Sequence, residues 1–270
     1  MKLLSIITIN KNNKKGLIRT IKSIINHGCL GDEIEYIIID SDSNDGSGEI
    51  IKEFEKKINI KFLIEKDGGI SEGMNKGLIM ANGLYTLFIN SGDELGGKIP
   101  KDQLISAHNN NIDICYGDYK TILGLNYTPD LINLNFFLRG SLPHCATFTK
   151  TNILKSNNFN LNYKVAMDWD VYLKLVYFKK VKYQKLINYF NIMEEGGVSS
   201  TSQEIIDIER FNTLNELFGS IGSDLHTIGR DLQKLNSYEQ SRLHSTLNSI
   251  TLNSKTKSIL KLLRYIFPKN

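Results

Sequence analysis

Short apolar runs alternate with amphipathic stretches along the first 90 residues, and this alternation restricts the fold more than any other feature. Four apolar runs of the length of buried strands lie at 4–9, 36–39, 61–64 and 85–89. Between them lie stretches with apolar residues at helical spacing, at 17–25, 50–58 and 70–81. Strands that alternate with helices predict a mainly parallel sheet with helices on both faces, so the expected fold class is α/β.

Polar side chains follow the predicted strands where each one ends. In open α/β sheets, ligands bind beyond the carboxyl ends of the strands. Asn10, Asp40, Asp67 and Asp93 all lie at or just after such ends. Polar turns explain one or two of these positions, but carboxylates at three of four ends favour a binding site.

The second half of the chain is less regular. Residues 112–116 and 119–125 have the pattern of two strands, which we expect to form a hairpin. Residues 163–177 predict a loop that runs into a helix. The chain becomes helical and polar after Gly197. We therefore expect a first domain at 1–200 and a helical C-terminal extension at 201–270.

Charge excludes some functions and points to the C-terminal segment. The 33 basic and 29 acidic residues give a net charge of +4, which is too small to indicate a nucleic-acid binder. Residues 254–270 hold five basic and no acidic residues, so the remaining chain carries −1. This segment also contains apolar residues between the basic ones. It fits either an anionic membrane surface, which we favour slightly, or a contact with the body or with a second subunit of a homo-oligomer.

Three cysteines, Cys29, Cys115 and Cys145, show neither disulfide nor zinc spacing, which fits a reducing cytosol. The apolar stretch at 3–9 is too short for a signal peptide and is interpreted as the first strand. No apolar run reaches the roughly 18 residues that span a bilayer. We expect a cytoplasmic protein, with a peripheral place on the inner face of the membrane if residues 254–270 bind lipid.

Asp93 directly follows a predicted buried strand, in the run Ser91-Gly92-Asp93. A carboxylate there can hold a divalent cation that bridges phosphate oxygens, or it can cap a turn. The two interpretations are equal for Asp93 alone, and the neighbouring strand ends favour the cation. Asp40 is the best candidate of its loop to accept hydrogen bonds from a base or ribose.

Two glycines precede the predicted helix at 70–81, which contains Asn75 and Lys76. Glycines allow close backbone approach, and a helix N-terminus favours an anion. The spacing is not that of a P-loop, and no GxGxxG follows the first strand, which argues against a dinucleotide fold.

Asp168, Trp169 and Asp170 open another predicted helix. Aspartates two residues apart point to different sides of a helix, so one can face a cleft as a general base while the other caps the helix. Both can instead interact with the helix dipole. His144 and Trp169 are each, taken alone, more often structural than functional.

Several blocks together resemble bacterial family-2 glycosyltransferases with the GT-A (Rossmann-like) fold. The blocks are SIITINKNN, IEYIIIDSDSNDGS, EKDGGISEGMNKGLIMANGLYTLFINSGDEL, LPHCATFTK, AMDWDVYLKL and EEGGVSS, within residues 1–200. The third is the most specific and is similar to the branch with an NSGD form of the metal motif. The family moves a sugar from a nucleotide diphosphate donor to an acceptor hydroxyl, with inversion.

The resemblance implies roles for single residues. The donor, most simply a UDP-sugar, would contact Thr8, Asn10, Asp40, Asp67, Asn75, Lys76 and Ser91. Asp93 would hold Mg²⁺ or Mn²⁺. Asp168 would be the catalytic base. His144, Trp169 and Asp170 would lie near the acceptor or the diphosphate. The acceptor would be a glycan or lipid-linked oligosaccharide in surface polysaccharide biosynthesis, without nucleic-acid partners.

The chain departs from the family pattern at two places. Ser91 stands where the metal motif usually has an acid. Ser41 follows Asp40 where Asp or Gly is commoner, which leaves the identity of the nucleotide base in the donor open. Asp170 also fits the family's motif for the catalytic base, although we favour Asp168. One alternative is a sugar-nucleotide nucleotidyltransferase, which would want glycines that residues 10–15 lack. Another is a non-catalytic module that binds nucleotide sugars.

Overall fold

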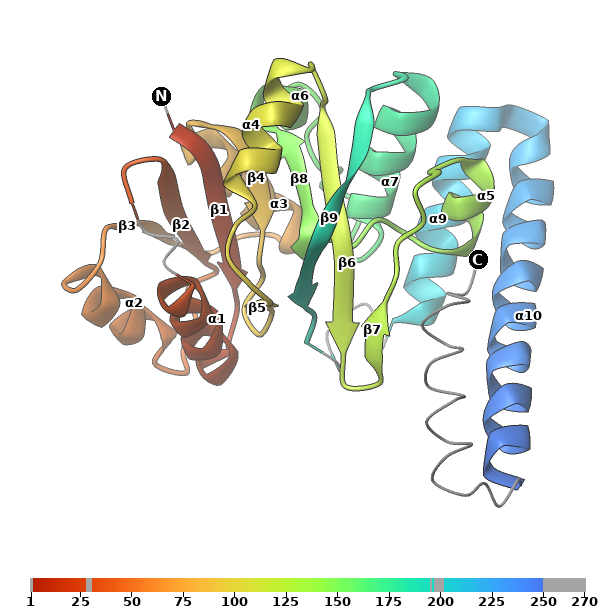
Figure 1. Ribbon diagram of the computed structural model, residues 1–270, viewed down its shortest axis with the longest axis horizontal. Coiled ribbons are helices and arrows are strands. Elements are labelled where there is room, and N and C mark those ends of the chain that lie inside the picture. The colour runs from red at the N-terminus through yellow and green to blue at the C-terminus, as the bar shows by residue number, and fades with distance from the viewer. Residues whose placement is uncertain (1, 28–30, 195, 197–201, 250–270) are drawn as a thin grey trace. The chain divides into compact units, whose positions relative to one another are not determined.

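A computed structural model describes residues 2–27, 31–194, 196 and 202–249 (Figure 1). The basic segment at 254–270 and Cys29 lie outside the described residues. The chain divides into two compact units, Met1–Asp130 with Ser141–Arg210, and Leu131–Gly140 with Phe211–Asn270. The domain boundary near residue 200 stays a prediction.

One mixed sheet of nine strands forms the centre of the first unit within the described residues. The strands of its parallel part are β1 (Lys2–Asn10), β2 (Ile34–Asp40), β3 (Ile60–Ile64) and β4 (Gly83–Phe88). Their order is β3-β2-β1-β4, and each neighbouring pair is parallel. Their carboxyl ends therefore meet at one edge, as predicted from the alternation of strands and helices.

The other strands extend the sheet beyond β4. They are β5 (Glu94–Leu95), β6 (Ile114–Thr121), β7 (Gly124–Asn126), β8 (Thr147–Lys150) and β9 (Tyr183–Ile192). β8 is antiparallel to both β4 and β6, and β6 is parallel to β9. The last residues of β9 thereby reach the same edge of the sheet as the ends of β1 and β4 (Figure 1).

The helices of this unit are α1 (Lys14–Asn26), α2 (Ser47–Glu55), α3 (Ile70–Met80), α4 (Lys101–Asn109), α6 (Thr151–Lys155) and α7 (Met167–Leu173), with a π-helical turn at Lys174–Phe178. Side chains of β1 alternate between two layers of helices. Ile6 belongs to one buried cluster with Leu17 of α1, whereas Ile7 faces Gly77 of α3. The α/β class with helices on both faces is confirmed.

The predicted hairpin is placed differently in the structure. β6 runs without a turn from Ile114 to Thr121. The next strand along the chain, β7, then pairs with the end of β6 in the antiparallel direction. Gly117 marks the irregularity: a Cβ there would lie 2.4 Å from the Tyr189 carbonyl oxygen of β9. The polar break at 117–118 is thus a bulge against β9 and not a turn.

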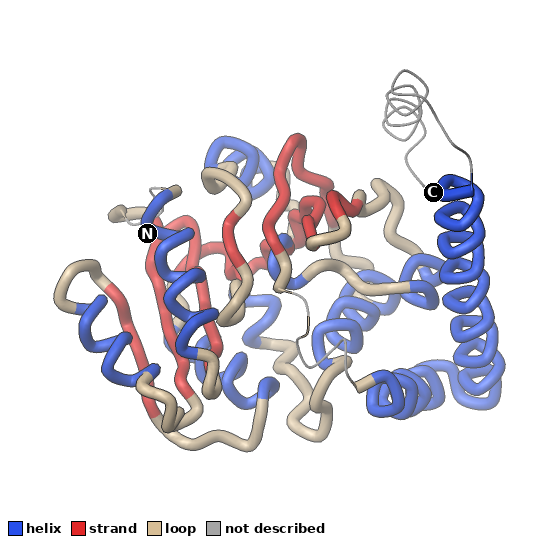
Figure 2. Tube along the Cα trace, turned by 90° about the horizontal axis from the view of Figure 1, so that it is seen from below, coloured by secondary structure: helices blue, strands red, loops and turns tan. Residues whose placement is uncertain are grey.

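The second unit is helical, as expected for a C-terminal extension. It contains α5 (Leu134–Arg139), the end of α9 (Gln203–Phe218) and α10 (Gly222–Ser249). α10 is the long helix on the right of Figure 2. Gly229 lets α10 approach the backbone of Leu138, whose carbonyl also accepts a hydrogen bond from Gln233 at 3.1 Å. Among the described helices, none has the length and apolar character to cross a bilayer.

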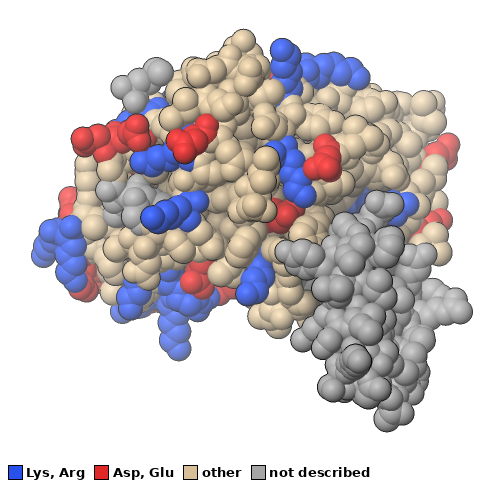
Figure 3. All heavy atoms as spheres, in the orientation of Figure 1, with Lys and Arg blue, Asp and Glu red and all other residues tan. Residues whose placement is uncertain are grey.

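Acidic and basic side chains are interspersed on the face of the molecule shown in Figure 3. This distribution agrees with the near-zero charge of the chain without residues 254–270.

Glu35 is a buried carboxylate that ties β2 to its neighbours. It accepts hydrogen bonds from Ser5 at 2.6 Å, the Asn82 amide at 2.5 Å and Lys61 at 2.7 Å. Burial opposes its charge, but these three donors outweigh burial and hold the pKa of Glu35 below its ordinary value of 4.5. A lowered pKa stabilises the fold above the unfolded-state pKa, and that stability is lost as the pH falls through the folded-state pKa.

We therefore expect Glu35→Gln to lower the free energy of unfolding at pH 7 by about 1–3 kcal/mol. The deficit should shrink as the pH falls below about 4.5, because the carboxylate of the unfolded chain takes up a proton there and that of the folded protein follows at lower pH. Urea denaturation at pH 7 and pH 4 measures both values. Glu53→Gln, which breaks an exposed pair with Lys57, is the control and should leave stability almost unchanged. Equal losses in the two variants, or a loss independent of pH, would contradict this interpretation.

Candidate active site

A cavity of about 610 Å³ lies beyond the carboxyl ends of β1 and β4. It extends to the 3₁₀ turn His144–Ala146 and to the start of α7. Of the residues predicted from the sequence, those on its wall are Asn10, Asp67, Ser91, Asp93, His144, Asp168 and Trp169. The structure thus brings together residues from five separate parts of the chain.

Asn10 and Asp40 are paired at the ends of adjacent strands. The Asn10 amide nitrogen donates to Asp40 at 2.6 Å, and Asp40 also accepts from the backbone and hydroxyl of Ser43, both at 2.8 Å. Asp40 is fully buried behind the cavity wall. Its hydrogen bond fixes the Asn10 amide, whose buried Oδ1 has no hydrogen-bond partner among the described residues.

Asp67 lies at the N-terminal end of α3. It accepts hydrogen bonds from the Ser41 hydroxyl at 2.8 Å and from the Gly69 amide at 3.1 Å. Gly69 has φ of +136°, a conformation that favours glycine and lets the chain turn into the helix. Gly69 therefore shapes the wall of the cavity.

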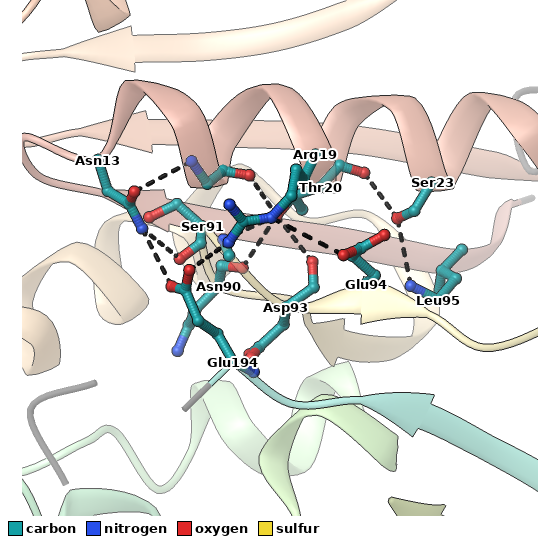
Figure 4. A network of polar contacts seen from close by, with 12 residues as sticks. Asn13, Arg19, Thr20, Ser23, Asn90, Ser91, Asp93, Glu94, Leu95 and Glu194 are labelled. Carbon is teal, nitrogen blue, oxygen red and sulfur yellow. Dashed lines mark hydrogen bonds and ion pairs between the residues drawn. The ribbon is translucent and has the colours of Figure 1, made fainter. Parts of the chain in front are cut away.

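Asp93 is held from two sides. Its Oδ1 accepts the backbone N–H of Glu194 at 2.8 Å, and its Oδ2 lies 3.2 Å from Nε2 of His144. Thr20 of α1 donates to the Asp93 carbonyl at 2.7 Å and accepts from the Gly92 amide at 2.9 Å (Figure 4). These contacts leave the carboxylate little freedom to rotate.

Glu194, just after β9, completes the support of this loop and was not predicted from the sequence. Its carboxylate forms an ion pair with Arg19 and accepts from Asn13 at 3.2 Å, while Asn13 also donates to the Ser91 carbonyl at 3.0 Å (Figure 4). Gly92 has φ of +109°, and a Cβ there would lie 1.8 Å from Glu194 Oε2. Glycine is therefore required between Ser91 and Asp93. The only signal for Glu194 is its place in the block EEGGVSS.

His144 lies between two carboxylates. Its Nε2 faces Asp93, and its Nδ1 lies 3.6 Å from Oδ2 of Asp168. Burial opposes a charged ring, but the Asp168 and Asp93 carboxylates outweigh burial and raise the pKa of His144 to about 10. The ring thus links the Asp93 side of the cavity to the Asp168 side.

The two aspartates of α7 point in different directions, as predicted. Asp168 lies on the cavity wall. Asp170 is buried and pairs with Lys174 at 2.9 Å, one turn along the helix. Trp169 is also buried and presents its ring to Arg210, whose guanidinium carbon lies 5.0 Å from the ring centroid. The cavity-facing carboxylate is therefore Asp168.

Three other predicted site residues do not line the cavity. Thr8 is buried and donates to the Ile89 carbonyl at 2.6 Å. Asn75 makes two backbone hydrogen bonds to Phe159, at 2.9 and 3.0 Å. Lys76 pairs with Glu65 and Glu72 at 2.7 and 3.1 Å. In the structure these side chains hold elements around the cavity together.

The polar groups at Asp93 fit a divalent cation that is shared with a ligand. Within the part of the chain that the structure describes, no three His, Cys, Asp or Glu residues form a metal site by themselves. Mg²⁺, however, is commonly bound by one or two carboxylates together with substrate phosphates. Asp93, with its rotation restricted, would supply one such carboxylate.

Comparisons with known proteins agree with this arrangement. The sequence profile of glycosyl transferase family 2 matches residues 5–139, half of the chain. A poly(ribitol-phosphate) β-N-acetylglucosaminyltransferase, TarP of Staphylococcus aureus, is 35% identical over 122 residues, which are 44% of this chain and 37% of that protein. The minor teichoic acid biosynthesis protein GgaB of Bacillus subtilis is 29% identical over 198 residues, 67% of this chain and 22% of GgaB. The chain thus matches less than half the length of these two relatives.

Solved structures show the same fold. Residues 1–349 of S. aureus TarS in complex with UDP-GlcNAc match with a TM-score of 0.64 and 20% identity, over 80% of this chain and 67% of that one. A mannosyltransferase of Pyrobaculum calidifontis in complex with GDP-Man and Mn²⁺ matches with a TM-score of 0.62 and 11% identity, over 98% and 81% of the two chains.

Proposed function

The chain belongs to glycosyl transferase family 2, and on this premise we propose that it transfers a sugar from a UDP-sugar to a hydroxyl of a cell-surface polymer, with inversion. One observation carries the proposal: a single cavity is lined by Asn10, Asp93 and Asp168. These three side chains suit, in turn, a nucleotide base, a metal-bound diphosphate and an acceptor hydroxyl.

The nucleotide base of the donor is assigned from Asn10. A buried amide oxygen without a hydrogen bond costs free energy, so its natural ligand supplies an N–H. Uracil offers N3–H at its Watson–Crick edge. The structure of TarS, which shares the fold, contains UDP-GlcNAc. Because the other bases also offer N–H groups, the choice of uridine rests on the nucleotide bound in TarS.

The diphosphate is assigned to the Asp93 end of the cavity. A divalent cation held there would neutralise the charge that develops on the leaving diphosphate. The chain's own contribution is to fix the carboxylate, through the Glu194 amide and the His144 ring. Metal dependence in this chain is part of the proposal.

Asp168 is assigned as the general base. Inversion requires a base on the face of the sugar opposite the leaving group, and the transition state resembles an oxocarbenium ion. Asp168 lies across the His144 ring from Asp93, and this separation supports the assignment. The carboxylate accepts the proton of the attacking hydroxyl while the bond to the diphosphate breaks.

The acceptor is assigned from the relatives. TarP acts on poly(ribitol-phosphate), and GgaB takes part in teichoic acid synthesis. We propose a polymer of this class, or a lipid-linked precursor of one, for this chain. Cys115 and Cys145 are buried and unbridged, which supports the proposed cytosolic location.

Thermal unfolding with UDP, GDP, CDP and ADP, each with and without Mn²⁺, tests the donor assignment. A ligand that binds only the folded protein stabilises it according to its concentration relative to Kd. We expect the largest shift with UDP and Mn²⁺, and we expect Asn10→Ala to reduce the preference for UDP. Asn109→Ala, at an exposed position of α4, is the matched control. Equal shifts for all four nucleotides, or none for UDP, would refute a uridine donor.

A further inference from the structure

Arg210 of α9 is a cation on the wall of the same cavity. Its guanidinium carbon lies 5.0 Å from the centroid of the Trp169 ring, a cation–π distance. Its Nε is buried and has no hydrogen-bond partner among the described residues. No described carboxylate lies within ion-pair distance of this guanidinium, in contrast to Arg19 with Glu194.

Arg210 is half-buried, and its buried Nε lacks a hydrogen bond, so a ligand oxygen that accepts one there would be stabilised. Burial lowers the pKa of Arg210, against the fields of Asp168 and Asp207, but arginine remains charged in proteins. The planar guanidinium fork matches the oxygens of a phosphate group better than lysine does.

The position of Arg210 distinguishes between two phosphate sources. Asp93 lies beyond β4, whereas Arg210 packs on Trp169, the residue next to Asp168. A phosphate at Arg210 is therefore at the end of the cavity where the acceptor hydroxyl meets its base. This argues for a phosphate of the acceptor and against the diphosphate of the donor.

The preceding residue fixes α9 against the loop that leads into α7. The Glu209 carboxylate accepts the backbone N–H groups of Lys164, Val165 and Ala166, at 2.5, 3.1 and 2.7 Å. Three hydrogen bonds to a buried carboxylate hold Arg210 at a set distance from the first turn of α7. A preorganised cation beside a preorganised base is what recognition of an extended acceptor requires.

We propose that Arg210, stacked on Trp169, binds a phosphodiester of the acceptor polymer and places the neighbouring polyol hydroxyl at Asp168. This inference rests on the proposed function and adds a subsite to it. The acceptor class that it selects is a polyol phosphate, not a neutral glycan.

The test uses Arg210→Met, with Arg210→Lys as the conservative variant. Lys52→Met, at an exposed position of α2, is the control for loss of one positive charge. With a synthetic ribitol-phosphate oligomer as acceptor, we expect Arg210→Met to raise the acceptor KM about 10- to 100-fold, as for loss of charge-assisted hydrogen bonds. Arg210→Lys should recover part of this loss. The Kd for UDP with Mn²⁺ should change less than about twofold, which corresponds to about 0.4 kcal/mol.

Stability separates this role from a structural one. Met keeps an apolar side chain against the Trp169 ring and removes a half-buried charge, so Arg210→Met should unfold at about the same temperature as wild type. A marked loss of stability, together with an unchanged acceptor KM, would overturn the proposal. An equal loss of UDP affinity would assign Arg210 to the donor diphosphate and would also overturn it.

A binding measurement keeps the subsite testable without turnover. We expect ribitol 5-phosphate, but not ribitol, to stabilise the wild type and Lys52→Met in a saturable manner, and to have no such effect on Arg210→Met. Stabilisation that survives in Arg210→Met would overturn the subsite. Phosphate binding through Arg210 in a wild type that transfers no sugar would refute the proposed function and leave the subsite standing.

Discussion

Asp168→Asn is expected to lower kcat for sugar transfer by about 10²–10⁴-fold, the usual contribution of a general base. The amide keeps the size of the side chain but cannot accept the proton of the acceptor hydroxyl. Because Asp168 is assigned to the acceptor side, the Kd for UDP with Mn²⁺ should change less than about twofold, which corresponds to about 0.4 kcal/mol. Steady-state kinetics and a UDP titration on the same protein measure the two quantities.

Asp170→Asn is the matched control, since the same change is made two residues away on α7. Asp170 is buried against Lys174 and does not line the cavity, so its loss should lower stability more than kcat. The assignment of the base would be wrong if Asp170→Asn lost turnover and Asp168→Asn retained it. Folding of both variants can be compared by thermal unfolding before the kinetics are interpreted.

Asp93→Ala is expected to remove the part of UDP affinity that depends on a divalent cation. Asp93 is the carboxylate whose orientation the structure fixes at the diphosphate end of the cavity, through the Glu194 amide and His144. Without it, the cation keeps only phosphate and water ligands. Calorimetric titration of UDP in Mn²⁺ and in EDTA should show a large difference for wild type and almost none for Asp93→Ala.

Asp102→Ala, at an exposed position of α4, controls for the loss of one acidic residue and should behave as wild type. Titration curves that are the same in Mn²⁺ and EDTA for the wild type would show that donor binding does not need the cation. In that case the role assigned to Asp93 fails, although the assignment of Asp168 is unaffected.

The first half of the fold could be predicted because its strands and helices are specified locally. The runs that become β1, β2 and β4 are almost wholly buried, so each is a continuous apolar stretch that stands out against its flanks. β9 could not be found in this way. Its exposed and buried positions do not alternate regularly, and it pairs in parallel with β6, some 70 residues earlier in the chain.

The same difference between local and long-range contacts decides which site residues could be predicted. Asn10, Asp67 and Asp93 follow local strands, and the rule that ligands bind at carboxyl ends was enough to select them. Glu194 and Arg210 reach the cavity through β9 and α9, so only the tertiary structure shows that they belong to it. Helical periodicity predicted that Asp168 and Asp170 diverge, but not which of them faces the cavity.

The most direct test of the central claim is mass spectrometry of a ribitol-phosphate oligomer after incubation with the protein, Mn²⁺ and each of a panel of UDP-sugars. We predict that one UDP-sugar increases the acceptor mass by one sugar residue, with an equal amount of free UDP released. The same reaction with Asp168→Asn should fall by the factor given above. An acceptor that gains no mass with any UDP-sugar, or that gains as much mass with Asp168→Asn as with the wild type, would contradict the account.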